Sequence, residues 1–232
     1  MKYYNKKISY FTMKTLMTIG LAITPNNVNA AKNLLVINAS PNIDGSHSRA
    51  LCKHFVDKLE TRYPGQYVPI HRDLENEPIP YVHSESLEVI TSGTATTVEA
   101  KKLKLLSDTL IDELKYSDAV VIATPMHNFT IPAVLKAYFD LVLLAGKTFQ
   151  YTSAGPVGML TDRPVMLISA SGGCYAGTEG DFLVPYIKYT LRFIGINKVT
   201  SVVAEGLAMG EKKAMSLTKA SQLLEKNLEF FS

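Results

Sequence analysis

The sequence predicts an α/β protein, a doubly wound parallel sheet of five strands with helices on both faces. Two observations lead to this fold class. Short apolar runs alternate with longer amphipathic segments through most of the 232 residues. Each apolar run is continuous, as in strands that are buried on both faces of a sheet. The composition, with 47% hydrophobic and 19% charged residues, is typical of a globular chain of one sizeable domain plus an appendage.

The expected elements follow one another in a regular order. A strand over 33–39 precedes a helix over 48–61, and a short strand over 66–70 precedes a polar loop that reaches residue 97 with at most one short helix. Further strands are expected over 118–124, 164–170 and 198–204, and further helices around the stripe Leu103, Leu106, Leu110 and Leu114 and over 131–144, 182–194 and 212–230. Glycine, proline and tyrosine in segment 147–160 predict a β-excursion at the surface.

The charges are unevenly distributed. Residues 1–31 hold four lysines and no acidic residue, which leaves 20 basic and 21 acidic residues in the rest of the chain. The rest of the chain is therefore close to neutral, and its net charge gives no indication of binding to nucleic acid or to an anionic membrane. We therefore expect neither as a partner.

Residues 1–31 are expected to be an N-terminal extension, signal-like or disordered, of a domain over 32–232. After Met13 come Lys14, an apolar run over 15–23, a proline and a small-residue site before Ala31, which is the layout of a signal peptide. The apolar run is too short to span a bilayer, so a retained transmembrane helix is the weaker alternative. No stable membrane insertion of residues 32–232 is expected. A cytoplasmic location is expected, with export through residues 13–30 as the alternative.

Cys52 and Cys174 lie far apart and form no C-x-x-C motif. Neither a zinc cluster nor a dithiol redox centre is therefore expected, and no metal. Two buried or half-buried thiols are the simpler interpretation, and a single Cys52–Cys174 disulfide is the alternative.

The loop over 40–49 follows the first predicted strand and is rich in serine. It has neither the P-loop pattern nor the G-x-G-x-x-G fingerprint of dinucleotide sites. Its hydroxyls and backbone N–H groups at a helix N-terminus suit one terminal phosphate. The alternative is that Ser46 or Ser48 only caps the helix.

Two more loops follow predicted strands, over 125–132 and 169–177, so all three lie at the ligand-binding edge of a doubly wound sheet. The first offers the Asn128 amide and the apolar side chains of Met126 and Phe129, although such side chains are more often core. The second offers glycines that let the backbone approach a flat ligand. A catalytic base at His127 is not favoured, because the sequence assigns it no carboxylate partner.

Five stretches of the chain carry a family resemblance. They are the loop beginning at Ser40, Ala-Thr-Pro-Met-His-Asn-Phe (123–129), Leu-Lys-Ala-Tyr-Phe-Asp (135–140), Thr-Phe-Gln-Tyr-Thr (148–152) and Ser-Gly-Gly (171–173). With them, residues 32–230 resemble the FMN-dependent NADH azoreductases and quinone reductases. The resemblance implies a flavodoxin-like FMN-binding domain over 32–232.

The resemblance assigns site residues by position. Around the FMN phosphate it implies Ser40, Ser46, His47 and Ser48. Along the isoalloxazine it implies Met126, His127, Asn128 and Phe129, and at the polar edge of that ring Ala170, Ser171, Gly172 and Gly173. As walls of the substrate pocket it implies Tyr151 and Phe193. The family commonly has tyrosine where this chain has His127 and serine where it has Ala170, so two side-chain hydroxyls are lost.

The activity that the resemblance implies is reduction of quinones to hydroquinones and of azo compounds to amines, with NADH as donor and by ping-pong transfer of two electrons. FMN, one per subunit of a homodimer, would carry the chemistry, so no catalytic side chain is expected. The alternative is a non-enzymatic electron carrier of the flavodoxin type. A hydrolase that uses His71, His83 or His127 is disfavoured, because no G-x-S-x-G elbow follows a strand.

Overall fold

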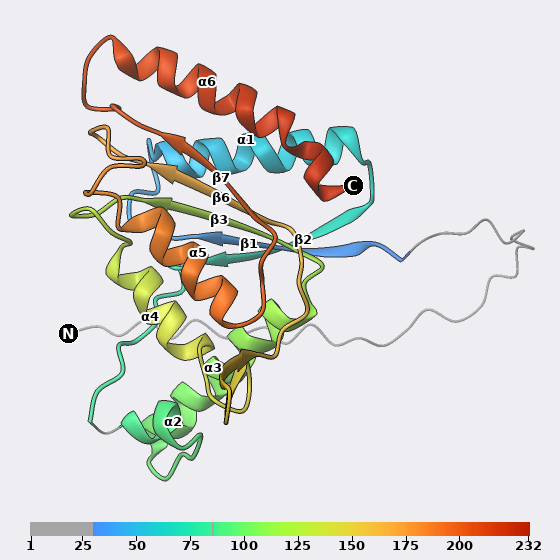
Figure 1. Cartoon of the computed structure of the whole chain (residues 1–232), viewed down its shortest axis with the longest axis vertical. Coiled ribbons are helices and arrows are strands. Elements are labelled where there is room, and N and C mark those ends of the chain that lie inside the picture. The colour runs from blue at the N-terminus through green and yellow to red at the C-terminus, as the bar shows by residue number, and fades with distance from the viewer. Residues whose placement is uncertain (1–29, 85) are drawn as a thin grey trace, which may run out of the picture. The chain divides into compact units, whose positions relative to one another are not determined.

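The computed structural model describes residues 30–84 and 86–232. Within the compact unit formed by residues 31–232, a five-stranded parallel sheet has the strand order β2-β1-β3-β6-β7. Helices α1 and α6 cover one face of this sheet, and α3, α4 and α5 cover the other (Figure 1). The predicted doubly wound sheet is confirmed.

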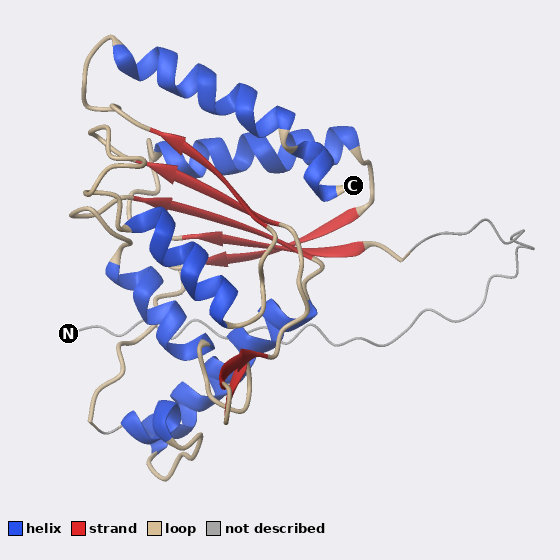
Figure 2. Cartoon of the chain, viewed as in Figure 1, coloured by secondary structure: helices blue, strands red, loops and turns tan. Residues whose placement is uncertain are grey.

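The element bounds follow the predicted order closely. The strands of the sheet are β1 (Lys32–Asn38), β2 (Tyr67–Asp73), β3 (Ala119–Pro125), β6 (Val165–Ala170) and β7 (Val199–Ala204). The helices are α1 (His47–Arg62), α2 (Leu87–Thr91), α3 (Val98–Tyr116), α4 (Ala133–Val142), α5 (Leu183–Phe193) and α6 (Lys212–Lys226). The predicted excursion is an antiparallel hairpin of β4 (Phe149–Thr152) and β5 (Gly155–Gly158), apart from the main sheet (Figure 2).

The two helical layers divide the side chains of each central strand between them. On β1, Leu35 and Ile37 pack toward α3, α4 and α5, whereas Leu34 and Val36 pack toward α1 and α6. Every residue of β6 is buried. Burial on both faces explains why these strands appear in the sequence as continuous apolar runs.

Polar groups fix both ends of α3. The Thr97 side chain accepts a hydrogen bond from the Ala100 N–H and so caps the first turn. At the other end, Nη1 of the buried Arg163 donates to the carbonyl oxygens of Leu114 and Lys115, at 2.6 and 3.0 Å. These bonds satisfy carbonyl groups that the end of a helix leaves without an intrahelical partner.

Three expectations differ from the structure. Strand β2 continues to Asp73, three residues beyond the predicted end, because pairing with β1 extends past the apolar run to the pair Asn38–Asp73. The last helix ends at Lys226, and a short 3-10 helix, Leu228–Phe231, follows it. Both thiols are free, but only Cys52 is buried, so the expectation for Cys174 was wrong: it lies in an exposed loop.

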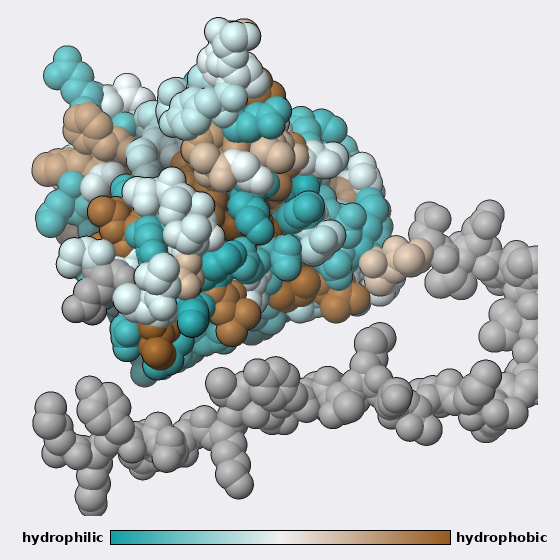
Figure 3. Space-filling model, turned by 90° about the horizontal axis from the view of Figure 1, so that it is seen from below, coloured by the Kyte–Doolittle hydropathy of each residue, from teal (hydrophilic) through white to brown (hydrophobic). Residues whose placement is uncertain are grey.

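Among the described residues, no helix is both long enough and apolar enough to cross a membrane. The signal-like segment 13–30 lies almost wholly outside these residues. On the face seen from below, apolar residues form small patches separated by hydrophilic ones (Figure 3). Within the described ranges, no group of three or more His, Cys, Asp and Glu side chains is placed to hold a metal ion.

Candidate functional site

A cavity of about 350 Å³ lies at the carboxyl edge of the sheet. Its size falls in the range of ligand pockets. Four loops line it, which follow β1, β3, β6 and β7. The lining residues are Ser40, Pro41, Asn42, Gly45, Ser46, His47, Ser48, Pro125, Met126, His127, Ala170, Ser171, Gly172, Leu207 and Ala208.

The first wall of the cavity is the start of α1. Ser46 is the N-cap residue, and its Oγ accepts a hydrogen bond from the Arg49 N–H at 3.4 Å. The Oγ atoms of Ser46 and Ser48 are 3.2 Å apart, and Ser48 is buried. The first turn of α1 contains no acidic residue. Hydroxyl groups and helix N–H groups therefore converge at the positive end of the helix dipole, where an anion is stabilised.

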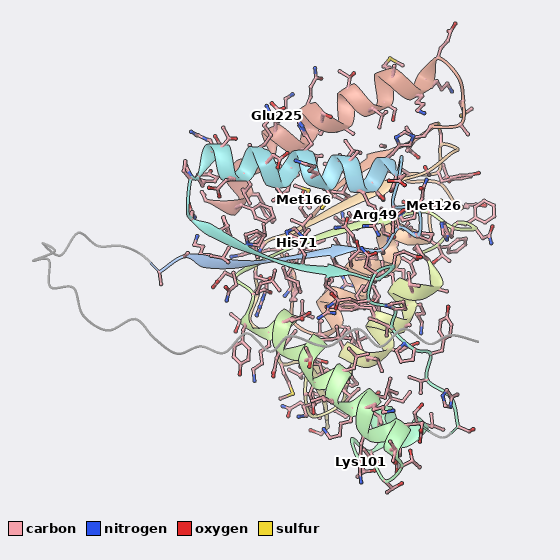
Figure 4. All side chains as sticks on the ribbon, turned by 180° about the vertical axis from the view of Figure 1, so that it is seen from behind. Arg49, His71, Lys101, Met126, Met166 and Glu225 are labelled. Carbon is pink, nitrogen blue, oxygen red and sulfur yellow. The ribbon has the colours of Figure 1, made fainter. Side chains whose placement is uncertain are left out.

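Arg49 holds the loop before α1 in place. Its Nε and Nη2 donate to the Ser40 carbonyl oxygen at 3.1 and 2.6 Å, and Nη2 also donates to Oδ1 of Asp73 at 2.8 Å. Hydrogen bonds from Arg49 lower the pKa of Asp73 to about 2. Arg49 lies near the same sheet edge as Met126 (Figure 4). The Arg49–Asp73 pair thus ties the loop after β1 to the end of β2.

The second wall is the loop after β3, a tight backbone turn. His127 and Thr130 exchange backbone hydrogen bonds of 2.9 and 3.1 Å. The two residues between them, Asn128 and Phe129, have φ angles of 47° and 71°. The Met126 N–H donates to the Ala170 carbonyl oxygen at 2.8 Å, so the loop is also held to β6. The conformation of this wall is therefore set by the backbone.

The loops after β6 and β7 are joined to each other by backbone hydrogen bonds. The N–H groups of Leu207 and Ala208 donate to the carbonyl oxygens of Ser171 and Gly172, each at 3.1 Å. A Cβ atom at Gly173 would lie 2.7 Å from the Tyr175 ring, so this position requires glycine unless the ring moves. Together the two loops close the third side of the cavity.

The structure brings most of the predicted site residues together. The predicted residues that line the cavity are Ser40, Ser46, His47, Ser48, Met126, His127, Ala170, Ser171 and Gly172. Asn128, Phe129 and Gly173 belong to the same loops but lie outside the lining. Sequence reasoning missed Leu207 and Ala208, although they follow a strand at the same edge, and it missed the Arg49–Asp73 pair.

Tyr151 and Phe193 lie elsewhere in this chain. Both contact Phe149, with ring centroids 5.4 and 4.7 Å from it, and they form an aromatic cluster where the hairpin meets the end of α5. Helix α5 starts at the cavity edge of the sheet and runs away from it, so this cluster is remote from the cavity of the same chain (Figure 1). Tyr151 is 73% exposed.

The fold and the cavity together define a class of protein. A doubly wound sheet of order β2-β1-β3-β6-β7 carries an anion-stabilising helix start after β1 and backbone-lined loops after β3, β6 and β7. This is the arrangement of flavodoxin-like proteins, which bind a mononucleotide at the point where the strand order reverses.

Comparison with known proteins gives the family. Residues 32–228 match the model of the family described as "Flavodoxin-like fold", and the chain belongs to this family.

Two relatives and one solved structure are similar over most of the chain. The FMN-dependent NADH:quinone oxidoreductase of Alcanivorax borkumensis is 42% identical over 82% of this chain and 98% of its own length. That of Hyphomonas neptunium is 40% identical over 86% and 97%. The FMN-dependent NADH-azoreductase of Bacillus anthracis, solved in complex with FMN, superposes with a TM-score of 0.78 at 29% identity, over 86% of this chain and 99% of that one.

Proposed function

We propose that this protein is an FMN-dependent oxidoreductase that uses NADH to reduce quinones and azo compounds. The observation that carries the proposal is the cavity at the start of α1, lined by buried hydroxyls on one side and by backbone turns on the other. Relatives that are 40–42% identical over more than four fifths of the chain are named FMN-dependent NADH:quinone oxidoreductases, and the similar solved structure is named an FMN-dependent NADH-azoreductase. The cavity residues all lie between 40 and 208, so we assign the FMN-binding domain to residues 32–232.

The residues present fit FMN. A phosphate dianion needs several donors and no nearby carboxylate, and the start of α1 offers Ser46, Ser48 and free helix N–H groups without an acidic residue in its first turn. A flat ring needs backbone that can come close, and the turns around Met126 and Gly172 meet this need. We therefore assign the phosphate to the first wall and the isoalloxazine to the second and third.

When bound, FMN supplies the chemistry, which is acceptance of a hydride from NADH and its delivery to a quinone or azo compound. The protein binds and orients the cofactor. The family resemblance implies serine at position 170, where this chain has alanine. The backbone carbonyl of Ala170 accepts the Met126 N–H, so the loss of the serine hydroxyl leaves that loop contact unchanged. His127 contributes a polar imidazole to the wall assigned to the ring, at a position where the family resemblance implies tyrosine.

We also propose that the substrate pocket is completed by a second copy of the chain. Aromatic side chains beside the cavity are exposed, with Phe129 at 50% and Phe182 at 60%. Exposed apolar surface of this kind marks an interaction site. In a homodimer, Tyr151 and Phe193 of one copy would face the cavity of the other. Equilibrium sedimentation tests this, because the proposal requires a dimer at micromolar concentration.

The test of the proposed function starts from the colour of the purified protein. We expect a yellow protein that releases FMN on denaturation, and chromatography of the flavin distinguishes FMN from FAD. Anaerobic NADH should bleach the flavin absorption, and a quinone should restore it. Initial rates should give parallel double-reciprocal lines, because one pocket serves both substrates in turn.

Two results would contradict the proposal. Stoichiometric FAD would show that the phosphate assignment is wrong. Bound FMN that NADH does not bleach would favour the alternative, an electron carrier without NADH-dependent activity. We further propose a cytoplasmic location, because the reaction consumes NADH.

A further inference from the structure

The cavity contains a pair of titratable side chains in an otherwise uncharged lining. Of the described residues that line it, His47 and His127 carry imidazole groups, the side-chain type that can gain a proton near neutral pH, and none is Asp, Glu, Lys or Arg. His47 is the first residue of α1, on the phosphate wall, and is half-buried. His127 is exposed and belongs to the loop after β3. The charge of this cavity is therefore decided by two imidazoles.

The charged groups on the segments around the cavity are engaged or stand outside it. Arg49 is paired with Asp73. The Glu205 carboxylate accepts the N–H groups of Tyr175 and Ala176 at 2.5 and 2.6 Å.

Asp44, in the loop after β1, and Lys212, at the start of α6, are both exposed and do not belong to the lining. With Arg49 and Glu205 already engaged, His47 is the ionisable side chain nearest in sequence to the serines that we assign to the phosphate.

The position of His47 makes its charge depend on whether the phosphate is present. In the cofactor-free protein, the positive end of the α1 dipole opposes a positive charge on the imidazole. A phosphate dianion at the same helix end reverses this preference, because a charged donor binds it more strongly than a neutral one. Ligand binding and protonation of one side chain are then coupled.

We infer that His47 takes up a proton when FMN binds, so that the affinity for FMN increases as the pH falls from 8.5 to 6.5. The inference rests on the proposed function, since it takes FMN as the cofactor. It makes His47 the charged donor of a phosphate site that otherwise consists of neutral groups. His127 belongs to the wall assigned to the ring, which FMN and riboflavin share, so it cannot produce a difference between these two ligands.

The experiment is a titration of the cofactor-free protein with FMN at pH 6.5, 7.5 and 8.5, followed by quenching of flavin fluorescence. These values keep the phosphate mostly in its dianionic form, since the second pKa of a phosphate ester is about 6. Uptake of one proton can change Kd by up to tenfold for each pH unit. We expect the Kd of the parent protein to be about tenfold lower at pH 6.5 than at pH 8.5.

Two variants and one second ligand locate the effect. His47→Gln keeps a hydrogen-bond donor but cannot gain charge, so its Kd for FMN should change by less than about twofold across the range. His127→Gln, the matched control from the opposite wall, should keep the dependence of the parent. Riboflavin, which has no phosphate, should bind the parent protein with little pH dependence. Calorimetry in two buffers of different ionisation enthalpy should detect proton uptake with FMN in the parent and not in His47→Gln.

The outcomes separate the inference from the proposed function. If the parent binds FMN with the same Kd at all three pH values, the inference is wrong while the proposed function stands. The inference also fails if His47→Gln keeps the pH dependence or if His127→Gln loses it. If FMN does not bind at any pH, the proposed function fails and the inference fails with it.

Discussion

Two of the three walls of the cavity, at the start of α1 and after β3, are built in different ways. The wall at the start of α1 depends on side chains: Ser46 and Ser48 present hydroxyls, and Arg49 holds the loop through its bonds to Ser40 and Asp73. The wall after β3 depends on the backbone, which turns back between His127 and Thr130. A side chain that makes a contact can be removed by substitution, whereas a backbone contact survives most substitutions. The first wall should therefore be much more sensitive to mutation than the second.

The largest expected effect is on the phosphate side. Ser46→Ala/Ser48→Ala removes two hydroxyls, each of which can make a charge-assisted bond worth about 1.5–3 kcal/mol. The Kd for FMN should therefore rise at least tenfold, and by a hundredfold or more if both bonds are made. Fluorescence titration measures this, and thermal melts with and without FMN separate binding from stability.

The same variant tests the alternative interpretation of these serines. As N-cap, Ser46 already bonds to the Arg49 N–H, and loss of a cap costs about 0.5–2 kcal/mol of stability. A lowered melting temperature of the cofactor-free protein is therefore expected in either case. A Kd for FMN within about threefold of the parent would mean that the serines only cap α1.

The next effect concerns the Arg49–Asp73 pair, which supports the wall at the start of α1. Asp73→Asn removes the charge that binds Arg49, and because Asp73 is partly exposed, solvent screening limits the expected loss of stability to about 1 kcal/mol. The Kd for FMN should rise a few-fold, since the Ser40 loop is less firmly held. Asp57→Asn is the matched control: it breaks an exposed pair with Lys53 and should change neither quantity measurably.

The pH dependence of this variant follows from the pKa of Asp73. Its pKa is lowered to about 2 in the folded protein, so the stabilisation is fully present above the unfolded value near 4 and is lost as the pH falls toward 2. The difference in unfolding free energy between parent and Asp73→Asn should therefore be constant above about pH 5 and shrink below pH 4. Urea denaturation at several pH values measures it. A difference that grows in acid would contradict the assignment.

Ser46 and the Arg49–Asp73 pair differ in whether they can be predicted from the sequence. Ser46 was predictable, because its role as a cap or phosphate ligand depends on the helix that begins at the next residue, His47. The buried runs of β3 and β6 were predictable for a similar reason, as both faces of each strand are apolar. Arg49 and Asp73 are 24 residues apart in sequence, and only the parallel pairing of β1 with β2 brings them together. Such a contact leaves no local pattern.

The next effect is on stability and is expected on the backbone-built wall. Asn128 is exposed and has a φ of 47°, a left-handed conformation that asparagine and glycine tolerate and alanine does not. Asn128→Ala should therefore lower the unfolding free energy by about 1 kcal/mol, and Asn128→Gly should change it by no more than about 0.5 kcal/mol. Denaturant unfolding compares the two. Equal stabilities would show that the side chain, and not the turn, matters at this position.

The smallest effect is expected at Ala170, where a serine would restore the residue that the family resemblance implies. Ala170 lines the cavity, but its contact with the neighbouring loop is made by its carbonyl oxygen, which accepts the Met126 N–H at 2.8 Å. A hydroxyl added on Cβ leaves that backbone bond intact. The Kd of Ala170→Ser for FMN should therefore stay within about twofold of the parent, a change of less than about 0.4 kcal/mol. Tenfold tighter binding would instead mean that side chains determine affinity beyond the wall at the start of α1, and the contrast between side-chain-built and backbone-built walls would fail.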